Sequence, residues 1–343
     1  MKYLLISILL VSSCTSPSTI KSILLTEQTS GSSASLRGLD VIDEQIAWAS
    51  GAEGTVLRTI DGGTTWENVS IATADTIDFR DIEAFSASEA VVLSAGFPGV
   101  VFKTTDGGKS WNLSYQDNRE DIFFDAMDFW DDKNGIAFGD AIDGRIVIIT
   151  TKDGGSSWQP TPPEDSPEAL DGEGGFAASG TCITTYGDSK VWIAMGAPKS
   201  RVLSSSDMGE TWMATETPMK QDAPGAGIFS LAFSNPNHGI AVGGNYMAPK
   251  SKTKVIAKTK DGGKTWDLIP DSGLNGYKSA VAKIPGAENW IASGPSGVSY
   301  SINNGINWQL LDSAEFHTVV MANSRFGWLT GGKGKISKLE ITY

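Results

Sequence analysis

Thr259-Lys260-Asp261-Gly262-Gly263-Lys264-Thr265-Trp266 is one copy of an eight-residue motif that recurs along the chain. Four more segments fit the same pattern, Ser/Thr-x-Asp-x-Gly-x-Thr/Ser-Trp, at residues 59–66, 104–111, 151–158 and 205–212. A sixth copy, residues 301–308, has Asn at the Asp and Thr/Ser positions. The tryptophans of successive copies are 45, 47, 54, 54 and 42 residues apart. A repeat of this length is typical of propellers and repeat arrays.

The motif has a direct physical interpretation as a stapled β-hairpin. An apolar, β-branched run precedes each copy and indicates a strand. Asp-x-Gly then predicts the turn, because Asp accepts from nearby backbone N–H groups and Gly adopts a positive φ. The Trp ring packs under the turn as a large apolar group. The predicted structural residues are Asp61, Trp66, Asp106, Trp111, Asp153, Trp158, Asp207, Trp212, Asp261, Trp266 and Trp308. A catalytic or metal-binding role is the alternative, but six near-equal copies favour a scaffold, since an enzyme needs one site.

Two further strand patterns precede the motif, and each of them occurs seven times. Together with the strands on either side of the motif they form a four-stranded unit, which is a propeller blade. The seventh unit ends at Tyr343 with neither motif nor fourth strand, while residues 20–26 form a strand that has no blade of its own. Pairing these two ends would close the ring and remove an exposed edge. We therefore predict an all-β, seven-bladed β-propeller over residues 20–343, without helices.

The N-terminus has the pattern of a bacterial lipoprotein signal. Lys2 is followed by a short apolar core, and Val11-Ser12-Ser13-Cys14 resembles a lipobox. We predict a signal peptide over residues 1–13, lipidation of Cys14, and a tether over residues 14–19. The expected location is the bacterial cell envelope, on the outer membrane facing the periplasm. The alternative is an ordinary secretory signal with a chance cysteine.

Composition narrows the range of partners. The formal net charge is −13 and the isoelectric point is near 4.6, which argues against nucleic acid as a ligand. Cys182 is the only other cysteine, so no disulfide within the folded part is expected, and we predict that it is a buried small apolar residue. The sequence has no phosphate loop and no His- or Cys-rich cluster, so we expect no cofactor and no metal. We also expect the protein to be a monomer.

The candidate site lies where the predicted inner strands begin. Aligning those strands places Arg37, Arg80, Asp125, Ser179, Phe229, Lys278 and His317 in one column near the central axis. The longest non-repetitive segments, residues 159–175, 213–227 and 243–254, open on the same face. Long loops on a rigid scaffold are where function concentrates. We predict partner binding by Arg37, Arg80, Asp125, Lys278 and His317; pairing of these groups with neighbouring residues such as Asp40, Asp81 and Glu83 is the alternative.

The repeated motif resembles the Asp-box, or bacterial neuraminidase repeat, of sialidases, sortilin-type receptors and the photosystem II assembly factor family. Leu36-Arg37-Gly38-Leu39-Asp40 and Phe79-Arg80-Asp81-Ile82-Glu83 are similar to the Leu-Arg-Asp-Ile start of blades in the last of these. The resemblance extends from about Ile20 to Tyr343, and two of the seven units carry the arginine. It implies a non-enzymatic assembly factor whose arginines near the axis engage a membrane-protein partner.

The favoured function is therefore an envelope lipoprotein that serves as a propeller scaffold, with an envelope protein or a glycan as partner. The alternatives are a glycan-binding protein, a sialidase-like or xyloglucanase-like hydrolase, and another propeller enzyme such as an oxidoreductase. A sialidase needs three converging arginines, and the chain has seven arginines in all. A xyloglucanase-like site needs two carboxylates that flank a sugar; Asp125 with Asp140 or Asp143 is the available combination.

Overall fold

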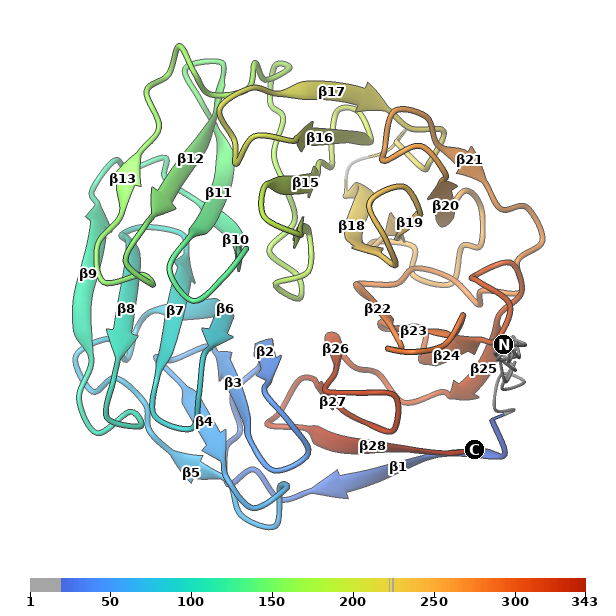
Figure 1. Cartoon of the computed structure of the whole chain (residues 1–343), viewed down its shortest axis with the longest axis horizontal. Helices are drawn as coiled ribbons and strands as arrows, with labels where there is room; N and C mark the ends of the chain where they lie inside the picture. Colours follow the sequence, from blue (N-terminus) through green and yellow to red (C-terminus); the bar gives the residue numbers. More distant parts are fainter. Residues whose placement is uncertain (1–19, 222, 224) are drawn as a thin grey trace, which may run out of the picture.

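The computed structural model describes residues 20–343 except Asp222 and Pro224, and it shows a ring of seven four-stranded antiparallel sheets (Figure 1). No helix occurs among the residues described. In each blade the first strand lies nearest the axis and the fourth lies at the rim. The predicted all-β, seven-bladed fold is confirmed.

The strands follow the chain blade by blade. Blade one comprises β2 (Leu36–Val41), β3 (Ala47–Gly51), β4 (Val56–Thr59) and β5 (Glu67–Asn68), and blade two comprises β6 (Asp78–Ala84), β7 (Ala90–Ala95), β8 (Gly99–Thr104) and β9 (Asn112–Asp117). Blade three comprises β10 (Phe124–Phe129), β11 (Gly135–Ile142), β12 (Arg145–Thr151) and β13 (Gln159–Pro160), and blade four comprises β14 (Ile183–Tyr186), β15 (Lys190–Ala194), β16 (Arg201–Ser205) and β17 (Met213–Glu216). Blade five comprises β18 (Ala226–Phe233), β19 (Gly239–Asn245), β20 (Ile256–Thr259) and β21 (Asp267–Leu268), and blade six comprises β22 (Ala280–Lys283), β23 (Trp290–Ser293), β24 (Val298–Ser301) and β25 (Gln309–Asp312). Blade seven comprises β26 (Thr318–Met321), β27 (Phe326–Thr330), β28 (Ile336–Thr342) and β1 (Ser22–Gln28).

The core lies between neighbouring blades rather than within one sheet. Trp48 of β3, for example, packs in one cluster with Phe79 of β6 and Val92 of β7. Every residue of β3 is buried, since both faces of the second strand are covered by adjacent blades. Strands covered on both faces appear in sequence as short continuous apolar runs, which is the pattern that identified them.

The Asp-box turns have the predicted geometry. Thr59 Oγ1 accepts from Gly63 N at 2.8 Å, and Asp61 accepts from Thr65 N at 2.9 Å and from Thr65 Oγ1 at 2.7 Å. The same bonds recur in the next four boxes. In the sixth box Asn303 accepts from Asn307 N at 2.9 Å and from Ser301 Oγ at 3.0 Å. Both glycines of the first box have positive φ, 71° and 82°. The box aspartates are therefore engaged by their own turns.

Hydrogen bonds within the turn also stabilise the ionised form of the box carboxylates. The bonds from the Ser110 hydroxyl and N–H lower the pKa of Asp106 to about 2, and the bonds from Thr65 lower the pKa of Asp61. Because these carboxylates are ionised and occupied, the structural interpretation of the motif fits better than a catalytic one.

One inner strand was predicted in the wrong place. The column aligned from the sequence placed Ser179 in the inner strand of blade four, whereas β14 spans Ile183–Tyr186. The inner strands of blades six and seven also begin later than expected, at Ala280 and Thr318. In blade four the chain leaves the sheet to run toward the axis before β14 begins, and the apolar alternation of this segment resembles that of a strand.

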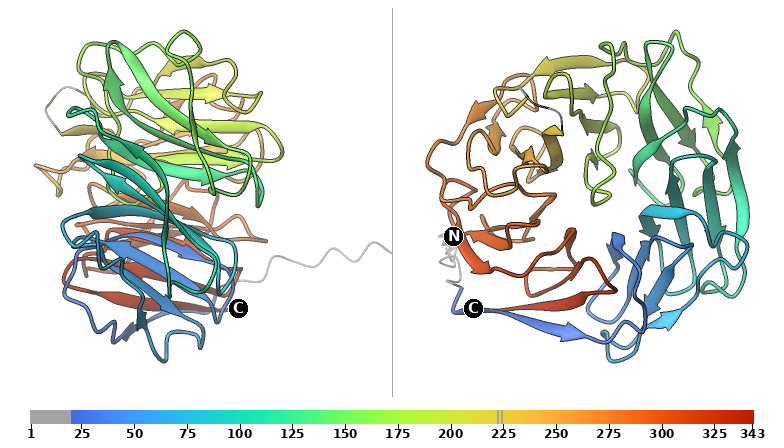
Figure 2. Two further views of the ribbon diagram at one scale, coloured as in Figure 1. Left: turned by 90° about the vertical axis from the view of Figure 1, so that its left-hand side faces the viewer. Right: turned by 180° about the vertical axis from the view of Figure 1, so that it is seen from behind.

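The two ends of the chain close the ring as predicted. β1 pairs with β28 in antiparallel register from Ser22↔Thr342 to Gln28↔Ile336 (Figures 1 and 2). Gln28 also links the last blade to the first: its Oε1 accepts from Trp66 Nε1 at 3.0 Å and from Trp328 Nε1 at 3.1 Å. Its Nε2 donates to Gly62 O at 3.2 Å.

We expect Gln28→Ala to lower the free energy of unfolding by about 1–3 kcal/mol, because it leaves two partly buried indole N–H groups without their acceptor. Gln28→Glu, which keeps an acceptor oxygen for the indole groups but loses the bond to Gly62 O, is the matched control and should retain more stability than Gln28→Ala. Urea unfolding followed by tryptophan fluorescence measures both variants. Equal stability of Gln28→Ala and the wild type would show that closure rests on strand pairing alone.

Candidate functional site at the axial mouth

The ring has two faces with different connections. The Asp-box turns and the turns between first and second strands form one face, which we call the box face. The loops between second and third strands and the connections between blades form the other, and the end of the central channel on that side is the axial mouth. The longest connections, between β13 and β14, between β21 and β22, and between β19 and β20, all belong to the mouth side.

The predicted column of residues sits at a repeated irregularity of the inner strands. The pairing register shifts at Arg37 in β2, at Arg80 in β6, at Asp125 in β10 and at Phe229 in β18. A bulge leaves its extra residue out of the ladder and bends the strand, which redirects that side chain. His317 directly precedes β26. In blades four and six the pairing register places Thr181 and Ser279 at this position, instead of the expected Ser179 and Lys278.

Two arginines and a histidine come together on one side of the axial mouth. Arg37 Nη1 donates to Ala178 O at 3.1 Å, and Arg80 Nη1 donates to Ala177 O at 3.2 Å. His317 Nε2 lies 3.1 Å from Ser35 Oγ. Burial, and then the charges of Arg37 and Arg80, lower the pKa of His317 to about 4, so its ring is neutral at pH 7. Arg80 Nε also donates to Asp78 Oδ2 at 2.8 Å. The group therefore presents two guanidinium ions, one of them paired with Asp78, and one neutral imidazole.

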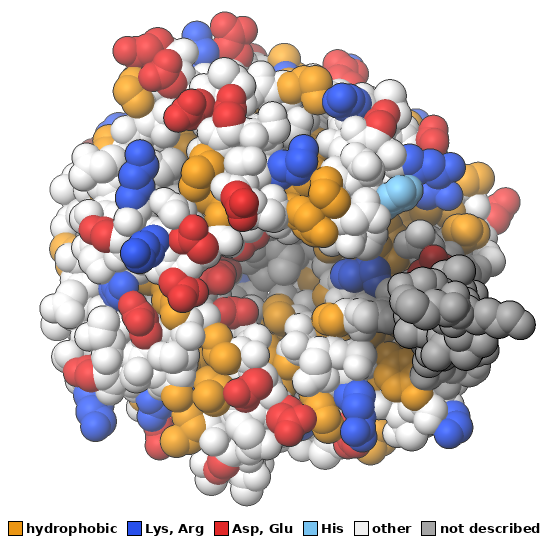
Figure 3. All heavy atoms as spheres, viewed as in Figure 1, with side chains coloured by type: hydrophobic (Ala, Val, Ile, Leu, Met, Phe, Trp, Pro, Cys, Tyr) orange, Lys and Arg blue, Asp and Glu red, His pale blue; other side chains and the backbone are white. Residues whose placement is uncertain are grey.

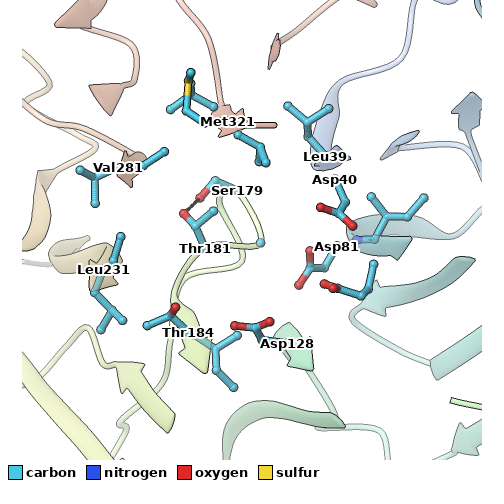
Figure 4. A pocket seen from close by; sticks show the side chains of 18 of the residues that line it. Leu39, Asp40, Asp81, Asp128, Ser179, Thr181, Thr184, Leu231, Val281 and Met321 are labelled. Atoms are coloured by element: carbon cyan, nitrogen blue, oxygen red, sulfur yellow. Dashed lines mark hydrogen bonds between the residues drawn. The ribbon is translucent and has the colours of Figure 1, made fainter. Parts of the chain in front are cut away.

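The carbonyls that these arginines bind belong to residues 176–181, which we call the axial segment. This segment leaves the long β13–β14 connection and runs into the middle of the ring (Figures 1 and 4). Ser179 Oγ donates to Ser279 O at 2.7 Å and Thr181 Oγ1 donates to Ser230 Oγ at 2.7 Å, so it also contacts blades six and five. Gly180 has φ of 73°, and a Cβ there would lie 2.2 Å from the Asp81 carboxylate. The axial segment thus covers the channel on the mouth side.

The connection that carries the axial segment is itself firmly held. Arg201 donates from Nε to Glu173 Oε1 at 2.6 Å, and Glu173 is fully buried in this ion pair. Gly175 N donates to Asp140 Oδ1 at 3.0 Å. These contacts fix the start of the axial segment against blades three and four.

Aromatic rings line the mouth on the side of blade five. Phe176 stacks on Phe229 with ring centroids 3.9 Å apart, and Tyr277 meets Phe229 edge-on at 4.5 Å. Tyr246 lies edge-on to both phenylalanines, with half of its surface exposed. We call these four residues the aromatic cluster. Only Phe229 was singled out from the sequence, because the others lie in connections that have no repeat to align.

Two of the predicted site residues are buried. Lys278 has no exposed surface, its Nζ donates to Gly297 O at 2.5 Å, and burial lowers its pKa to about 7. Asp125 is 1 % exposed. Neither offers its charge to a partner in this conformation, whereas Arg37, Arg80 and His317 lie at the mouth. The aligned column placed Asp125 at the correct position of its strand. The alignment could not show that the side chain is buried there.

Asp125 forms a carboxyl pair with Asp140 of β11. Burial, followed by the negative charge of Asp140, raises the pKa of Asp125 well above its usual range. A proton kept on Asp125 gives the pair one donor, which Asp125 needs because no other group donates to its oxygens among the residues described. Glycosidase carboxylates lie on either side of the sugar, separated by about 5 Å or more. A buried pair that shares a proton does not fit that arrangement, and Asp143 lies apart from it in the exposed β11–β12 turn.

Behind the axial segment the channel widens into a cavity of about 250 Å³. Its wall includes one apolar residue from each inner strand: Leu39, Ile82, Met127, Ile183, Leu231, Val281 and Val319. Four carboxylates, Asp40, Asp81, Glu83 and Asp128, line the side formed by blades one to three, opposite Leu231 and Val281 (Figure 4). In Figure 3 acidic side chains likewise gather beside the central hollow, over blades two and three.

Three of these carboxylates join neighbouring blades. Asp40 accepts from Ala84 N of blade two at 2.8 Å, Asp81 from Met127 N of blade three at 2.7 Å, and Asp128 from Thr185 N of blade four at 2.6 Å. Each also accepts from the N–H of the residue that follows it. They are therefore structural links around the axis. No group of three or more His, Cys, Asp or Glu side chains in the described part of the chain is arranged to hold a metal ion.

Burial makes these carboxylates unusually basic. Desolvation raises the pKa of Asp128 to about 6, and it raises the pKa of Asp81 and of Glu83 well above the usual range. For Glu83 the charges of Asp40, Asp128 and Asp81 add to the effect. Glu83 differs from the three aspartates in that it makes no link to the next blade through a backbone N–H.

Comparison with known proteins agrees with this architecture. The family model described as "Photosynthesis system II assembly factor YCF48" matches residues 29–119, which hold the strands of both mouth arginines. The photosystem II assembly lipoprotein Ycf48 of Synechococcus sp. (strain CC9902) is 31% identical over 90 residues. That match covers 25% of this chain and 24% of the relative. The chain resembles the Ycf48 propellers.

Solved structures extend the resemblance in fold to nearly the whole chain. A Ycf48 bound to a D1 peptide superposes with a TM-score of 0.68 at 16% identity, covering 95% of this chain and 99% of that one. Ycf48 from Cyanidioschyzon merolae gives 0.67 at 18% identity, covering 92% and 98%. A xyloglucanase of family GH74 from Xanthomonas campestris gives 0.62 at 14% identity, covering 92% of this chain and 53% of that one. At these identities the structures establish the propeller fold alone.

The raised pKa of Glu83 predicts a pH-dependent cost to folding. A carboxylate whose pKa is higher in the folded than in the unfolded chain destabilises the fold above its unfolded pKa, and the cost grows as pH rises through the folded pKa. Glu83→Gln should therefore raise the free energy of unfolding at pH 8, because it removes the cost of a buried negative charge. The gain should vanish near pH 4, where the Glu83 side chain of the wild type is protonated and therefore as neutral as the glutamine of the variant.

Urea unfolding at pH 4, 6 and 8 measures this effect. Glu120→Gln is the matched control, because Glu120 is exposed and its replacement should change stability little at any of these pH values. If Glu83→Gln raised the free energy of unfolding equally at all three pH values, the effect would come from packing rather than from charge.

Proposed function

We propose that this protein is a non-enzymatic scaffold of the bacterial cell envelope that binds an extended segment of another protein at the axial mouth. The observation that carries the proposal is the juxtaposition of Arg37 and Arg80 with the aromatic cluster on a rigid ring. Guanidinium groups bind carboxylates or carbonyls through paired N–H donors. Aromatic side chains offer a large apolar surface, against which apolar side chains of a partner can pack.

The axial segment supports this mode of binding by its own contacts. Its backbone carbonyls at Ala177 and Ala178 accept from the two arginines, and Phe176 stacks within the aromatic cluster. An extended peptide has the same chemical features: carbonyls for the arginines and apolar side chains for the aromatic rings. The arginines are half-buried rather than sealed, so a partner can reach them from the mouth side.

The Ycf48 whose structure contains a D1 peptide supplies a precedent for peptide binding by a propeller of this shape. Assembly of a membrane-protein partner is the corresponding role for this chain. The Synechococcus relative is named a lipoprotein, which agrees with the lipobox at Val11–Cys14, although those residues lie outside the described part of the structure. We accordingly propose that Cys14 carries a lipid and that residues 14–19 tether the propeller to the outer membrane. No helix in the described part of the chain has the length and apolarity to cross a membrane.

The double change Arg37→Ala with Arg80→Ala should abolish capture of the partner while the propeller stays folded. The test is cross-linking of the purified protein in envelope extract, followed by identification of the captured protein and a binding titration against it. A contact made by charges should also weaken as salt rises. Thermal melting checks that the variant is folded.

Lys109→Ala with Lys264→Ala is the control pair, since both lysines are exposed in box turns on the opposite face. Arg37→Lys with Arg80→Lys separates charge from geometry and should restore only part of the affinity. Undiminished capture by the Arg37→Ala, Arg80→Ala variant, or equal loss from the control pair, would move the binding site away from the mouth.

Lipidation is tested separately. Cys14→Ser should shift the protein from the membrane fraction to the soluble fraction and remove the lipid mass from the N-terminal peptide. Wild-type protein that fractionates like the variant, with no lipid on Cys14, would make residues 1–13 an ordinary secretory signal.

A further inference from the structure

The described chain begins and ends on the box face, opposite the axial mouth. In blades one to six an Asp-box turn joins the third strand to the fourth, whereas in blade seven these strands are β28 and β1, which no turn connects. Lys21 N donates to Thr342 O at 2.8 Å, and Lys21 Nζ donates to Tyr343 O at 2.8 Å, so both ends lie together. The side view in Figure 2 places the C-terminus at one broad face of the ring.

The two boxes beside blade seven differ from the others at their outward-pointing positions. The box of blade one has Ile60 at its second position, and the box of blade six has Ile302 and Ile306 at its second and sixth positions. These side chains are 50%, 52% and 46% exposed. The boxes of blades two to five have only polar or charged residues there: Thr105, Lys109, Lys152, Ser156, Ser206, Glu210, Lys260 and Lys264. The turn itself does not require isoleucine, because its hydrogen bonds come from other residues.

Ile20 extends this apolar surface toward blade seven. It lines a cavity of about 1060 Å³ on the box face together with Ile302, Pro285 and Ala287. We call Ile20, Ile60, Ile302 and Ile306 the isoleucine rim. It flanks the place where the chain leaves the propeller toward Cys14.

We infer that the isoleucine rim rests on the lipid bilayer that the lipid of Cys14 enters, so that the axial mouth faces away from the membrane. This inference depends on the proposed lipidation. Cys14 is six positions before Ile20 in the sequence, so the fully extended tether reaches only about 20 Å. Blades six, seven and one must therefore stay near the bilayer.

The contact with the bilayer is expected to be apolar rather than electrostatic. With a formal net charge of −13, the protein is repelled by anionic lipid headgroups rather than attracted to them. Exposed isoleucines gain free energy by leaving water for the interface between headgroups and acyl chains. Three such side chains on the two boxes that flank the tether orient the propeller where the tether alone leaves it free to turn.

The experiment uses the lipidated full-length protein in vesicles of phosphatidylethanolamine and phosphatidylglycerol that contain a lipid-bound fluorescence quencher. A dye is attached to Thr64→Cys, in the box of blade one, or to Ser206→Cys, in the box of blade four across the ring. Both positions are exposed, and Cys182 is buried, so the dye labels the introduced thiol. We expect quenching to be severalfold stronger at Thr64→Cys than at Ser206→Cys.

The isoleucines are then removed while the reporter stays. Ile60→Ser, Ile302→Ser and Ile306→Ser, combined with Thr64→Cys, should lower quenching to the level of Ser206→Cys without lowering the melting temperature. Equal quenching at both reporters in protein that floats with the vesicles would overturn the membrane-facing rim and leave the anchor standing. Protein that does not float ends both proposals. An isoleucine-dependent dimer in the absence of lipid would assign the rim to a second copy of the chain.

Discussion

The structure depends on the burial of both faces of every blade. Trp48, Trp192, Trp290 and Trp328 lie on second strands and are almost completely buried, because each blade is covered by a neighbour on either side. A sheet that is apolar on both faces has no free side to give to water, so a row of such blades is stable only when it closes. Closure in turn requires the fourth strand of the last blade to come from the start of the chain. The pairing of β1 with β28, and the two indole bonds to Gln28, follow from that requirement.

Closing seven blades leaves a narrow axis, and this sets the electrostatics of the site. Groups that converge there are removed from water, which disfavours their charged forms. Burial therefore raises the pKa values of the carboxylates and lowers the pKa values of Lys278 and His317. Hydrogen bonds across blade boundaries then hold three carboxylates in place. The same ring keeps Arg37 and Arg80 side by side on a scaffold that does not need to move. The binding proposed at the mouth would thus use an arrangement formed during folding.

Departures from the repeat are where the blades acquire individual roles. The bulges turn Arg37 and Arg80 toward the mouth, and the long connection before β14 supplies the axial segment that meets them. On the opposite face, isoleucines replace polar residues in two boxes that are otherwise built like the rest. Because the blades support one another through shared cores, surface positions and connections can vary without loss of the fold.

Local sequence determined the repeated features of this protein. Each Asp-box specifies its own turn through contacts within eight residues, and each apolar run specifies its own strand, so the number of blades, the closure and the burial of Cys182 could be read from the chain. The tertiary structure alone decided what happens at the axis. The axial segment and the carboxylate wall arise from residues that are 44 to 141 positions apart and meet only once the ring has closed. No periodicity in the sequence records such meetings, since each involves a different pair of blades and a different depth from water.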